Sequence, residues 1–146
     1  MNEQEYKLIR NLAWDVLIDS KAARLPINLA AIASLYKLNS PEEKLSFYVK
    51  AFQISSAILQ TFGLHGNEKI EYFTVRILAP ITVLNALNIT SPVEVTHFTG
   101  LPMNLAIRRF NRLQTVRKRG TIGMTKQERV VLERFQHWIS LNYKKQ

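Results

Sequence analysis

The 146 residues are the length of one domain, and 47% hydrophobic and 10% aromatic content is enough for a buried core. The chain contains no cysteine, which excludes disulfides and thiolate metal ligands and agrees with a reducing compartment. The 20 Lys and Arg against 11 Asp and Glu give a net charge of +9 at pH 7, which favours an anionic partner, nucleic acid first and an acidic protein second.

Residues 1–5 are polar and acidic, unlike the start of a signal peptide, and no apolar run reaches the length of a membrane span. Five Gly and five Pro without a low-complexity run leave little room for a disordered linker. We expect a soluble, cytoplasmic protein with one domain over 1–146. Within it, a helical core over 1–88 precedes a hairpin and a closing helix over 91–146.

Helical spacing of apolar residues begins near the N-terminus. Residues 3–19 fit a helix whose inner face carries Tyr6, Ile9, Ala13 and Val16. A basic connection over 20–26 follows, and Asn28 is predicted to be the N-cap of a short helix. Both helices are predicted to pack on the core through one face.

The most apolar segment, residues 40–63, is predicted to be one long central helix around which the chain is organised. Ser40 has the character of an N-cap, and Pro41 suits the first helical position because no backbone N–H is needed there. Gly63 is predicted to end the helix in a left-handed conformation. The segment has no His, Asp or Glu after Glu43, so its buried length offers neither a metal pair nor a general base.

The second half of the chain is also predicted to be helical. A helix begins near Glu68 and is ended or kinked by Pro80, after which residues 81–87 continue as helix. The spacing of Ile70, Phe73, Ile77 and Leu78 turns them inward. Ser91 with Glu94 then opens a short helix to 98, a longer helix follows from 103 to about 118, and Thr125 with Glu128 opens the last helix. No segment alternates as a strand does, so the predicted fold class is all-α, a compact multi-helix domain.

Residues 92–118 have the outline of a helix-turn-helix, with a short helix, a turn at Gly100 and a longer second helix. Val95, Leu101 and Ala106 fall where such a unit buries side chains. Arg109 does not fit, because that position is normally apolar.

The second helix of this hairpin carries most of the concentrated positive charge. At 100° per residue, Arg108, Arg112 and Arg119 lie opposite an apolar stripe of Met103, Ala106, Ile107, Phe110 and Leu113, so we expect them to be exposed together. They could contact phosphates or base edges, and a solvated basic face is an equally compatible interpretation. The candidate residues for binding a partner or nucleic acid are Arg108, Arg109, Arg112, Arg117, Lys118 and Arg119.

The sequence predicts no metal site and no cofactor. His65, His97 and His137 are far apart and lack the i, i+4 spacing of a helical zinc pair. The chain has no Gly-rich phosphate loop, and the serines at 55 and 56 have no neighbouring base, so nucleophilic catalysis has no support.

Four segments taken in order resemble the ImmA/IrrE family of bacterial and phage metallopeptidase-like proteins, which cut or disable repressors. Leu-Pro-Ile-Asn at 25–28 is similar to the family's Leu-Pro-Val-Asp entry to its first helix. Phe-Thr-Val-Arg-Ile-Leu-Ala-Pro at 73–80 is similar to its Phe-Ala-x-x-Leu-Leu-x-Pro helix. Segments 91–113 and 128–139 resemble the helical hairpin and closing helix that follow.

The departures from that family concern its zinc site. With residues 51–59 aligned to Ala-His-Glu-Leu-Gly-His-Ile-Leu-Leu, Phe52 and Ser56 replace the two zinc histidines and Gln53 replaces the catalytic Glu. Lys69 stands where the third ligand, a Glu, would fall, and the strands before the zinc helix are missing. The resemblance therefore implies a degenerate member that binds no zinc and has no catalytic residue.

Three functions follow as hypotheses. The preferred one is a non-catalytic regulatory binding protein of phage or mobile-element type, a pseudo-metallopeptidase that holds a regulatory protein such as a repressor. The alternative is a DNA-binding helix-turn-helix regulator that uses residues 103–119. A metallopeptidase with a relocated metal site is the third. The oligomeric state is left open.

Overall fold

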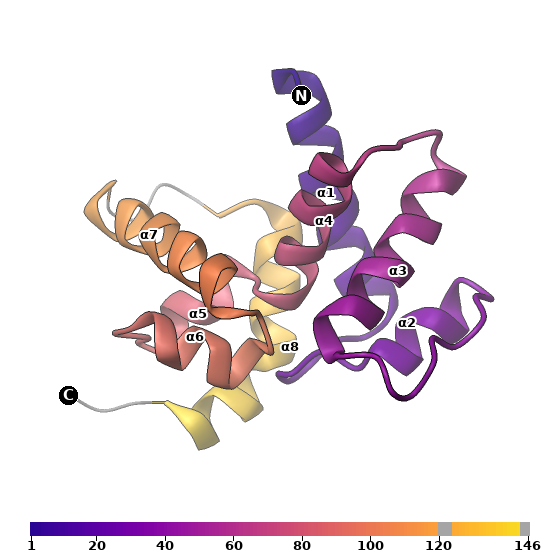
Figure 1. The fold of residues 1–146 in the computed structure, drawn as a ribbon. Coiled ribbons are helices and arrows are strands. Elements are labelled where there is room, and N and C mark those ends of the chain that lie inside the picture. Colours follow the sequence, from indigo (N-terminus) through magenta and orange to yellow (C-terminus); the bar gives the residue numbers. More distant parts are fainter. Residues whose placement is uncertain (120–123, 144–146) are drawn as a thin grey trace.

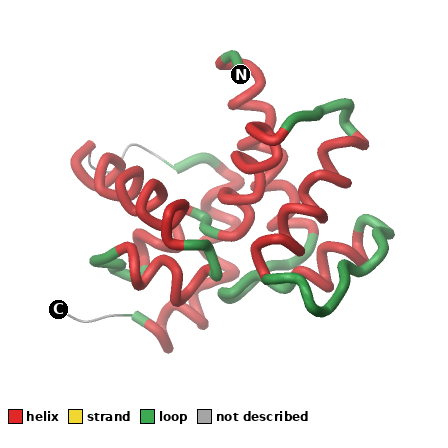
Figure 2. The backbone as a smooth tube through the Cα atoms, in the orientation of Figure 1, coloured by secondary structure: helices red, strands yellow, loops and turns green. Residues whose placement is uncertain are grey.

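The computed structural model describes residues 1–119 and 124–143, and within these ranges it contains helices, turns and no strand (Figures 1 and 2). The predicted all-α class is confirmed. The helices are α1 (Glu3–Asp19), α2 (Leu29–Leu35), α3 (Phe47–Thr61), α4 (Asn67–Leu78), α5 (Ile81–Ala86), α6 (Pro92–Thr99), α7 (Met103–Arg119) and α8 (Lys126–Asn142).

The helices pack as two groups joined through α1, α4 and α8. On one side α3 packs between α2 and α4, and on the other α6 and α7 form a hairpin beside α5 (Figure 1). Helix α1 packs along α4 and also contacts α8, which in turn contacts α5. The chain between α4 and α5 therefore passes from one group to the other. No helix in the described part of the chain is both long and apolar enough to cross a membrane.

Helix α1 has its predicted bounds, and α2 begins after its predicted N-cap, because N-caps are encoded locally. The Asn2 side chain accepts from the backbone N–H of Glu5, whose carboxylate accepts in return from the Asn2 N–H, a complete capping box. The Asn28 side chain accepts from the N–H of Ala31, as predicted. Ile9, Ala13 and Val16 are buried on the inner face of α1, whereas Tyr6 is half-buried.

The predicted start of α3 at Ser40 is wrong. Residues 40–46 are not helical, and the N–H of Leu45 donates to the Glu42 carbonyl in a turn. The cap is Ser46, whose hydroxyl accepts from the N–H of Val49 at 3.2 Å. Ser40 and Ser46 both have a side chain suited to an N-cap, and Ser46, directly before the apolar run, is the one that caps the helix. The left-handed end at Gly63 is confirmed by its φ of 71°.

Helix α4 buries Ile70, Phe73, Ile77 and Leu78, as its spacing predicts. Pro80 follows its last turn, and with a ψ of 122° it is the extended N-cap residue of α5. The side chains of Ser91 and Thr125 accept from the N–H groups of Glu94 and Glu128 and cap α6 and α8, also as predicted.

The turn between α6 and α7 also holds the two groups of helices together. Gly100 has a φ of 77°, and its N–H donates to the Thr96 carbonyl at 2.9 Å. A Cβ placed on Gly100 would lie 2.6 Å from Cδ2 of Phe47, at the start of α3. The turn therefore depends on glycine both for its conformation and for this close contact.

Candidate anion-binding site

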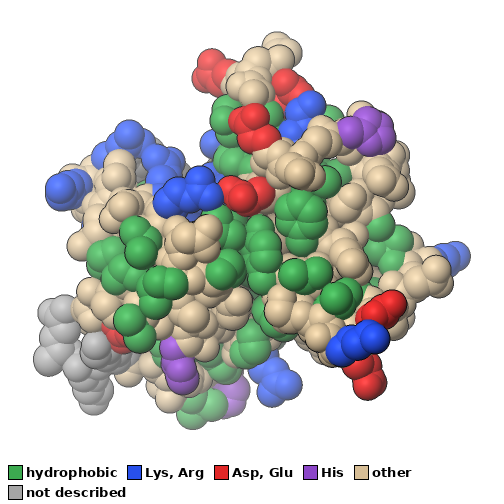
Figure 3. Space-filling view, viewed as in Figure 1, with side chains coloured by type: hydrophobic (Ala, Val, Ile, Leu, Met, Phe, Trp, Pro, Cys, Tyr) green, Lys and Arg blue, Asp and Glu red, His purple; other side chains and the backbone are tan. Residues whose placement is uncertain are grey.

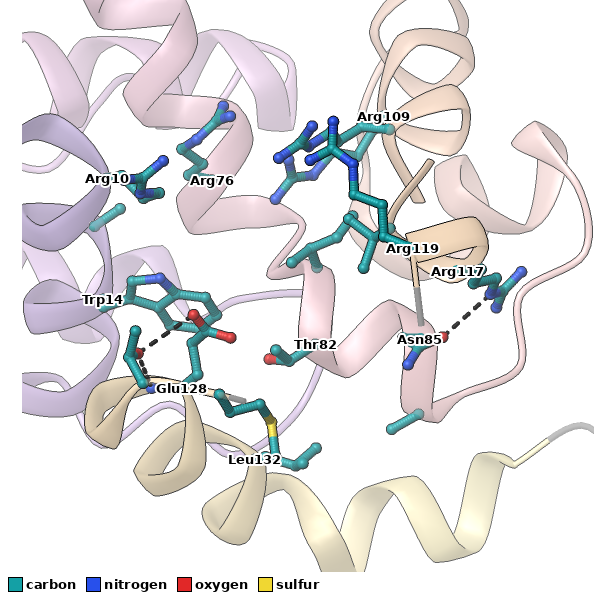
Figure 4. Close-up of a pocket in the computed structure, with 17 residues that line it drawn as sticks. Arg10, Trp14, Arg76, Thr82, Asn85, Arg109, Arg117, Arg119, Glu128 and Leu132 are labelled. Carbon is teal, nitrogen blue, oxygen red and sulfur yellow. Dashed lines mark hydrogen bonds between the residues drawn. The ribbon is translucent and has the colours of Figure 1, made fainter. Parts of the chain in front are cut away.

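A cavity of about 690 Å³ lies among α1, α4, α5, α7 and the start of α8 (Figure 4). Six arginines line it, and we call it the arginine pocket. They come from α1 (Arg10), α4 (Arg76) and α7 (Arg109, Arg112, Arg117 and Arg119).

Arg109 lies at the base of this pocket and is 6% exposed. Its Nε and Nη2 donate to the carbonyl oxygen of Ala79 at 2.9 and 2.7 Å, at the C-terminal end of α4. Burial, together with the nearby charge of Arg76, lowers the pKa of Arg109 to about 9. The residue that did not fit the helix-turn-helix pattern is thus a buried cation bound to the negative end of another helix.

Arg76 stands beside Arg109 on α4. Its guanidinium lies 3.4 Å from the centre of the Tyr72 ring, in a cation–π arrangement, and Nη1 donates to the Tyr72 carbonyl at 3.4 Å. Burial lowers the pKa of Arg76, and the charges of Arg112 and Arg10 add to that effect. The positive charges of four arginines, Arg10, Arg76, Arg109 and Arg112, therefore lie close enough to repel one another.

None of these four arginines, Arg10, Arg76, Arg109 and Arg112, forms an ion pair with a carboxylate in residues 1–119 and 124–143. The ion pairs found there join Glu68 to the N-terminal amine, Glu5 to Lys69, and Glu71 to Arg108. The pocket thus gathers positive charge that described carboxylates do not neutralise by direct pairing.

Arg117 lines the pocket but is occupied by other partners. Its Nη1 donates to the Ile89 carbonyl at 2.6 Å, and its Nε donates to Oδ1 of Asn85 at 3.1 Å (Figure 4). Arg117 therefore ties α7 to the chain that follows α5.

The remaining candidates on α7 differ in their surroundings. Arg108 donates to Glu71 at 2.7 Å, Lys118 is exposed and does not line the pocket, and Arg119 lies at its rim. Figure 3 shows basic side chains gathered along the edge of the hairpin, with an acidic side chain beside them. Of the six predicted residues, the structure brings Arg109, Arg112, Arg117 and Arg119 together around one cavity.

The apolar stripe predicted for α7 is partly wrong. Met103 and Ile107 are each 43% exposed, and the inward face consists of Leu105, Ala106, Arg109 and Leu113. Leu105 and Arg109 are buried where α7 packs on α6 and α5, which periodicity alone does not reveal.

The other wall of the pocket is apolar with two polar groups. Trp14, Ile81 and Leu132 line it, and Oγ1 of Thr82 is buried there without a hydrogen-bond partner among the described residues. Glu128 is the one acidic lining residue in the described part of the chain, and it lies beside the Thr125 hydroxyl at 3.3 Å (Figure 4). The pocket is thus cationic on one side and largely apolar on the other.

The positions that correspond to the zinc site of the ImmA/IrrE family lie elsewhere, on α3 and α4. The Phe52 ring packs against Tyr48 with ring centres 6.2 Å apart, Gln53 is exposed, and Ser56 is half-buried. Lys69 pairs with Glu5 at 2.7 Å. No group of three or more His, Asp or Glu in the described ranges is arranged to hold a metal.

Sequence reasoning missed Arg10 and Arg76 as site residues. A signal for Arg76 was available, because Tyr72 stands four residues before it and such i, i+4 pairs meet on a helix. For Arg10 no local signal exists, since only the packing of α1 on α4 brings it to the pocket.

No known protein family, curated protein or solved structure matches this chain. Membership of the ImmA/IrrE family therefore stays a prediction from four sequence segments.

Proposed function

We propose that this protein is a non-catalytic regulatory protein that binds DNA through the α6–α7 hairpin. The observation that carries the proposal is the composition of α7, which has no acidic residue among its 17 residues and has four exposed basic residues, Arg108, Arg112, Lys118 and Arg119. A helix with this charge suits contact with a phosphate backbone.

The exposed side of α7 supports this partner. It presents Asn104, Asn111 and Lys118, with Arg112 and Arg119 along one edge. These side chains donate hydrogen bonds to phosphate oxygens, and Asn and Arg also suit the edges of bases.

The packing of the hairpin supports a rigid binding element. Val95, Leu101 and Ala106 are completely buried, as the helix-turn-helix pattern predicts. They hold α6 against α7, so the outer residues of α7 stand on a fixed scaffold.

The test is a salt titration of binding to a mixed-sequence DNA duplex. We expect the affinity of the full chain to fall steeply with salt, and Lys118→Ala to weaken binding and reduce the log–log salt slope by about one. Lys50→Ala on α3, away from the hairpin, is the matched control and should change neither quantity. Affinity that does not depend on salt would contradict DNA binding.

A second candidate partner is a regulatory protein such as a repressor, bound by a pseudo-metallopeptidase of phage or mobile-element origin. The observation that favours it is the exposure of Met103 and Ile107 at 43% each on the same helix, because apolar groups bordered by basic ones suit a protein interface. A pull-down at near-physiological salt should then recover a protein that Ile107→Ser no longer binds. Recovery of no protein partner argues against this candidate.

A metallopeptidase with a relocated metal is the third candidate, and no arrangement of side chains described above favours it. Stoichiometric zinc in the purified protein would revive it. The same sample can serve for metal analysis and for the DNA titration.

A further inference from the structure

The arginine pocket combines features that the proposed DNA contact does not use. Arg10, Arg76, Arg109 and Arg112 line one cavity without an ion pair to a carboxylate in the described ranges, whereas Asn104, Asn111 and Lys118 on the exposed side of α7 lie outside it. Like charges held in a recess repel one another, and their repulsion is relieved when an anion binds between them.

The donors in this recess are suited to a phosphate. Nε and Nη2 of Arg109 donate to the Ala79 carbonyl. The N–H groups of Nη1 take no part in these two hydrogen bonds. Arg112 is exposed at the mouth, and Arg76 lies on the facing helix. Planar guanidinium groups that converge from two helices can bind phosphate oxygens from more than one side.

The rest of the pocket indicates that the anion carries an organic part. The volume of about 690 Å³ is far larger than one phosphate and lies within the range of small-molecule sites. Trp14, Ile81 and Leu132 supply an apolar wall, and the unpartnered Thr82 hydroxyl supplies a polar group there. Figure 4 shows Arg76 and Arg109 above the space and Arg119 to its right, with Arg10 and Trp14 at its left and Leu132 below.

We propose that the arginine pocket binds a phosphorylated small molecule with an aromatic or otherwise apolar body, of about the size of a mononucleotide. The phosphate is held by Arg76, Arg109 and Arg112, and the body lies against Trp14. Because the pocket is built from both groups of helices, a bound ligand joins α1 and α4 to α7. This inference shares Arg112 with the proposed DNA contact, but Arg10, Arg76, Arg109 and Trp14 belong to the pocket and not to the exposed side of α7.

The experiment measures binding of inorganic pyrophosphate and of adenosine monophosphate to the full chain at constant ionic strength. Trp14 reports on the pocket, and Trp138→Phe removes the only other tryptophan, so that the fluorescence comes from Trp14 alone. We expect both probes to bind and to change this fluorescence, and adenosine without phosphate to bind far more weakly. Calorimetry on the unmodified chain gives the affinities.

Arg112→Ala is the test variant, because Arg112 is exposed and its loss leaves the core intact. We expect it to weaken binding of both probes by about tenfold or more. Lys118→Ala, on the same helix but outside the pocket, is the matched control and should bind both probes as the wild type does.

Three results would overturn the proposal. The first is no binding of pyrophosphate at millimolar concentration, and the second is equal binding by Arg112→Ala and the wild type. The third is that a DNA duplex competes with pyrophosphate at equal ionic strength and that Arg112→Ala abolishes this competition. That result would assign the pocket to DNA phosphates. Failure of DNA binding alone leaves the pyrophosphate result unchanged, so the two proposals fail separately.

Discussion

Arg109 of α7 donates from both Nε and Nη2 to the carbonyl oxygen of Ala79, the residue that ends α4. Ala79 is completely buried, so its carbonyl has no water to replace these donors. The last carbonyls of a helix lack hydrogen-bond partners within the helix and carry partial negative charge. A guanidinium group supplies both the missing donors and a positive charge. One side chain thus connects the two groups of helices at the base of the arginine pocket.

Replacing Arg109 with Met tests whether these hydrogen bonds outweigh the cost of a buried charge. Met keeps the length of the side chain but leaves the Ala79 carbonyl unsatisfied, so we expect the free energy of unfolding to fall by about 2 kcal/mol. Denaturant unfolding measures this change. Arg108→Met, at the neighbouring exposed position with a surface ion pair, should lower it by less than about 1 kcal/mol. An Arg109→Met protein more stable than the wild type would mean that repulsion from Arg76 is the larger effect.

Gly100→Ala should lower the free energy of unfolding by about 2–3 kcal/mol. A residue with a Cβ is unfavourable in the left-handed conformation, and this Cβ would also clash with the Phe47 ring. Gly63→Ala is the matched control: its φ is 71°, against 77° at Gly100, but a Cβ there meets nothing within 4 Å. Gly63→Ala should lower the free energy of unfolding by about 1 kcal/mol, which is the cost of the left-handed conformation alone. Thermal and denaturant unfolding of both variants give the difference.

The Phe47 contact itself can be separated by a double-mutant cycle. In a Phe47→Ala background, Gly100→Ala should cost about as much as Gly63→Ala does, because the aromatic ring is gone. A cost for Gly100→Ala that does not change in this background would show that the contact with Phe47 carries none of the effect.

Features of the fold that depend on local chemistry could be predicted from the sequence. The caps at Asn28, Ser91 and Thr125 form as expected, since each requires only a short side chain and an N–H three residues later. The start of α3 could not be chosen in the same way. Ser40 and Ser46 both have the short hydroxyl side chain that an N-cap requires, and the packed helix begins after Ser46.

The site was less predictable because it is assembled by tertiary packing. The charge on α7 is evident from the sequence, yet periodicity gives the face of a residue and not its neighbours. Arg109 was recognised as misplaced for a buried helical position, but its partner at Ala79 is 30 residues away in the chain. Arg10 comes from α1, and no spacing in the sequence connects it with α7.

Arg117→Met should separate stability from anion binding. Arg117 is already held by Asn85 and the Ile89 carbonyl, so we expect the free energy of unfolding to fall by about 1 kcal/mol. Burial lowers the pKa of Arg117, its Nε and Nη1 donate within the protein, and its Nη2 is buried without a hydrogen-bond partner among the described residues. Its loss should therefore weaken pyrophosphate binding less than Arg112→Ala does. An equal or larger loss of affinity than that of Arg112→Ala would place Arg117 among the ligand-binding groups.

Lys69→Met should make the stability of the protein depend differently on pH. Lys69 Nζ lies 2.7 Å from Oε2 of Glu5, and this contact, followed by the Asn2 N–H, lowers the pKa of Glu5 below 4.5. A carboxylate whose pKa is lower in the folded state stabilises the protein above its unfolded pKa, and that stabilisation is lost as the pH falls through the folded pKa. At pH 7 the variant should therefore have a lower Tm than the wild type.

This difference in Tm should shrink as the pH falls through the lowered folded pKa of Glu5, because below it Glu5 is protonated in both proteins. Lys118→Met removes the same charge from an exposed position outside any ion pair found in the described ranges, so it controls for the change in net charge. Its Tm difference from the wild type should not follow the titration of Glu5. A Tm deficit of Lys69→Met that is as large at about pH 3 as at neutral pH would mean that Lys69 stabilises the protein by packing, and not through its contact with Glu5.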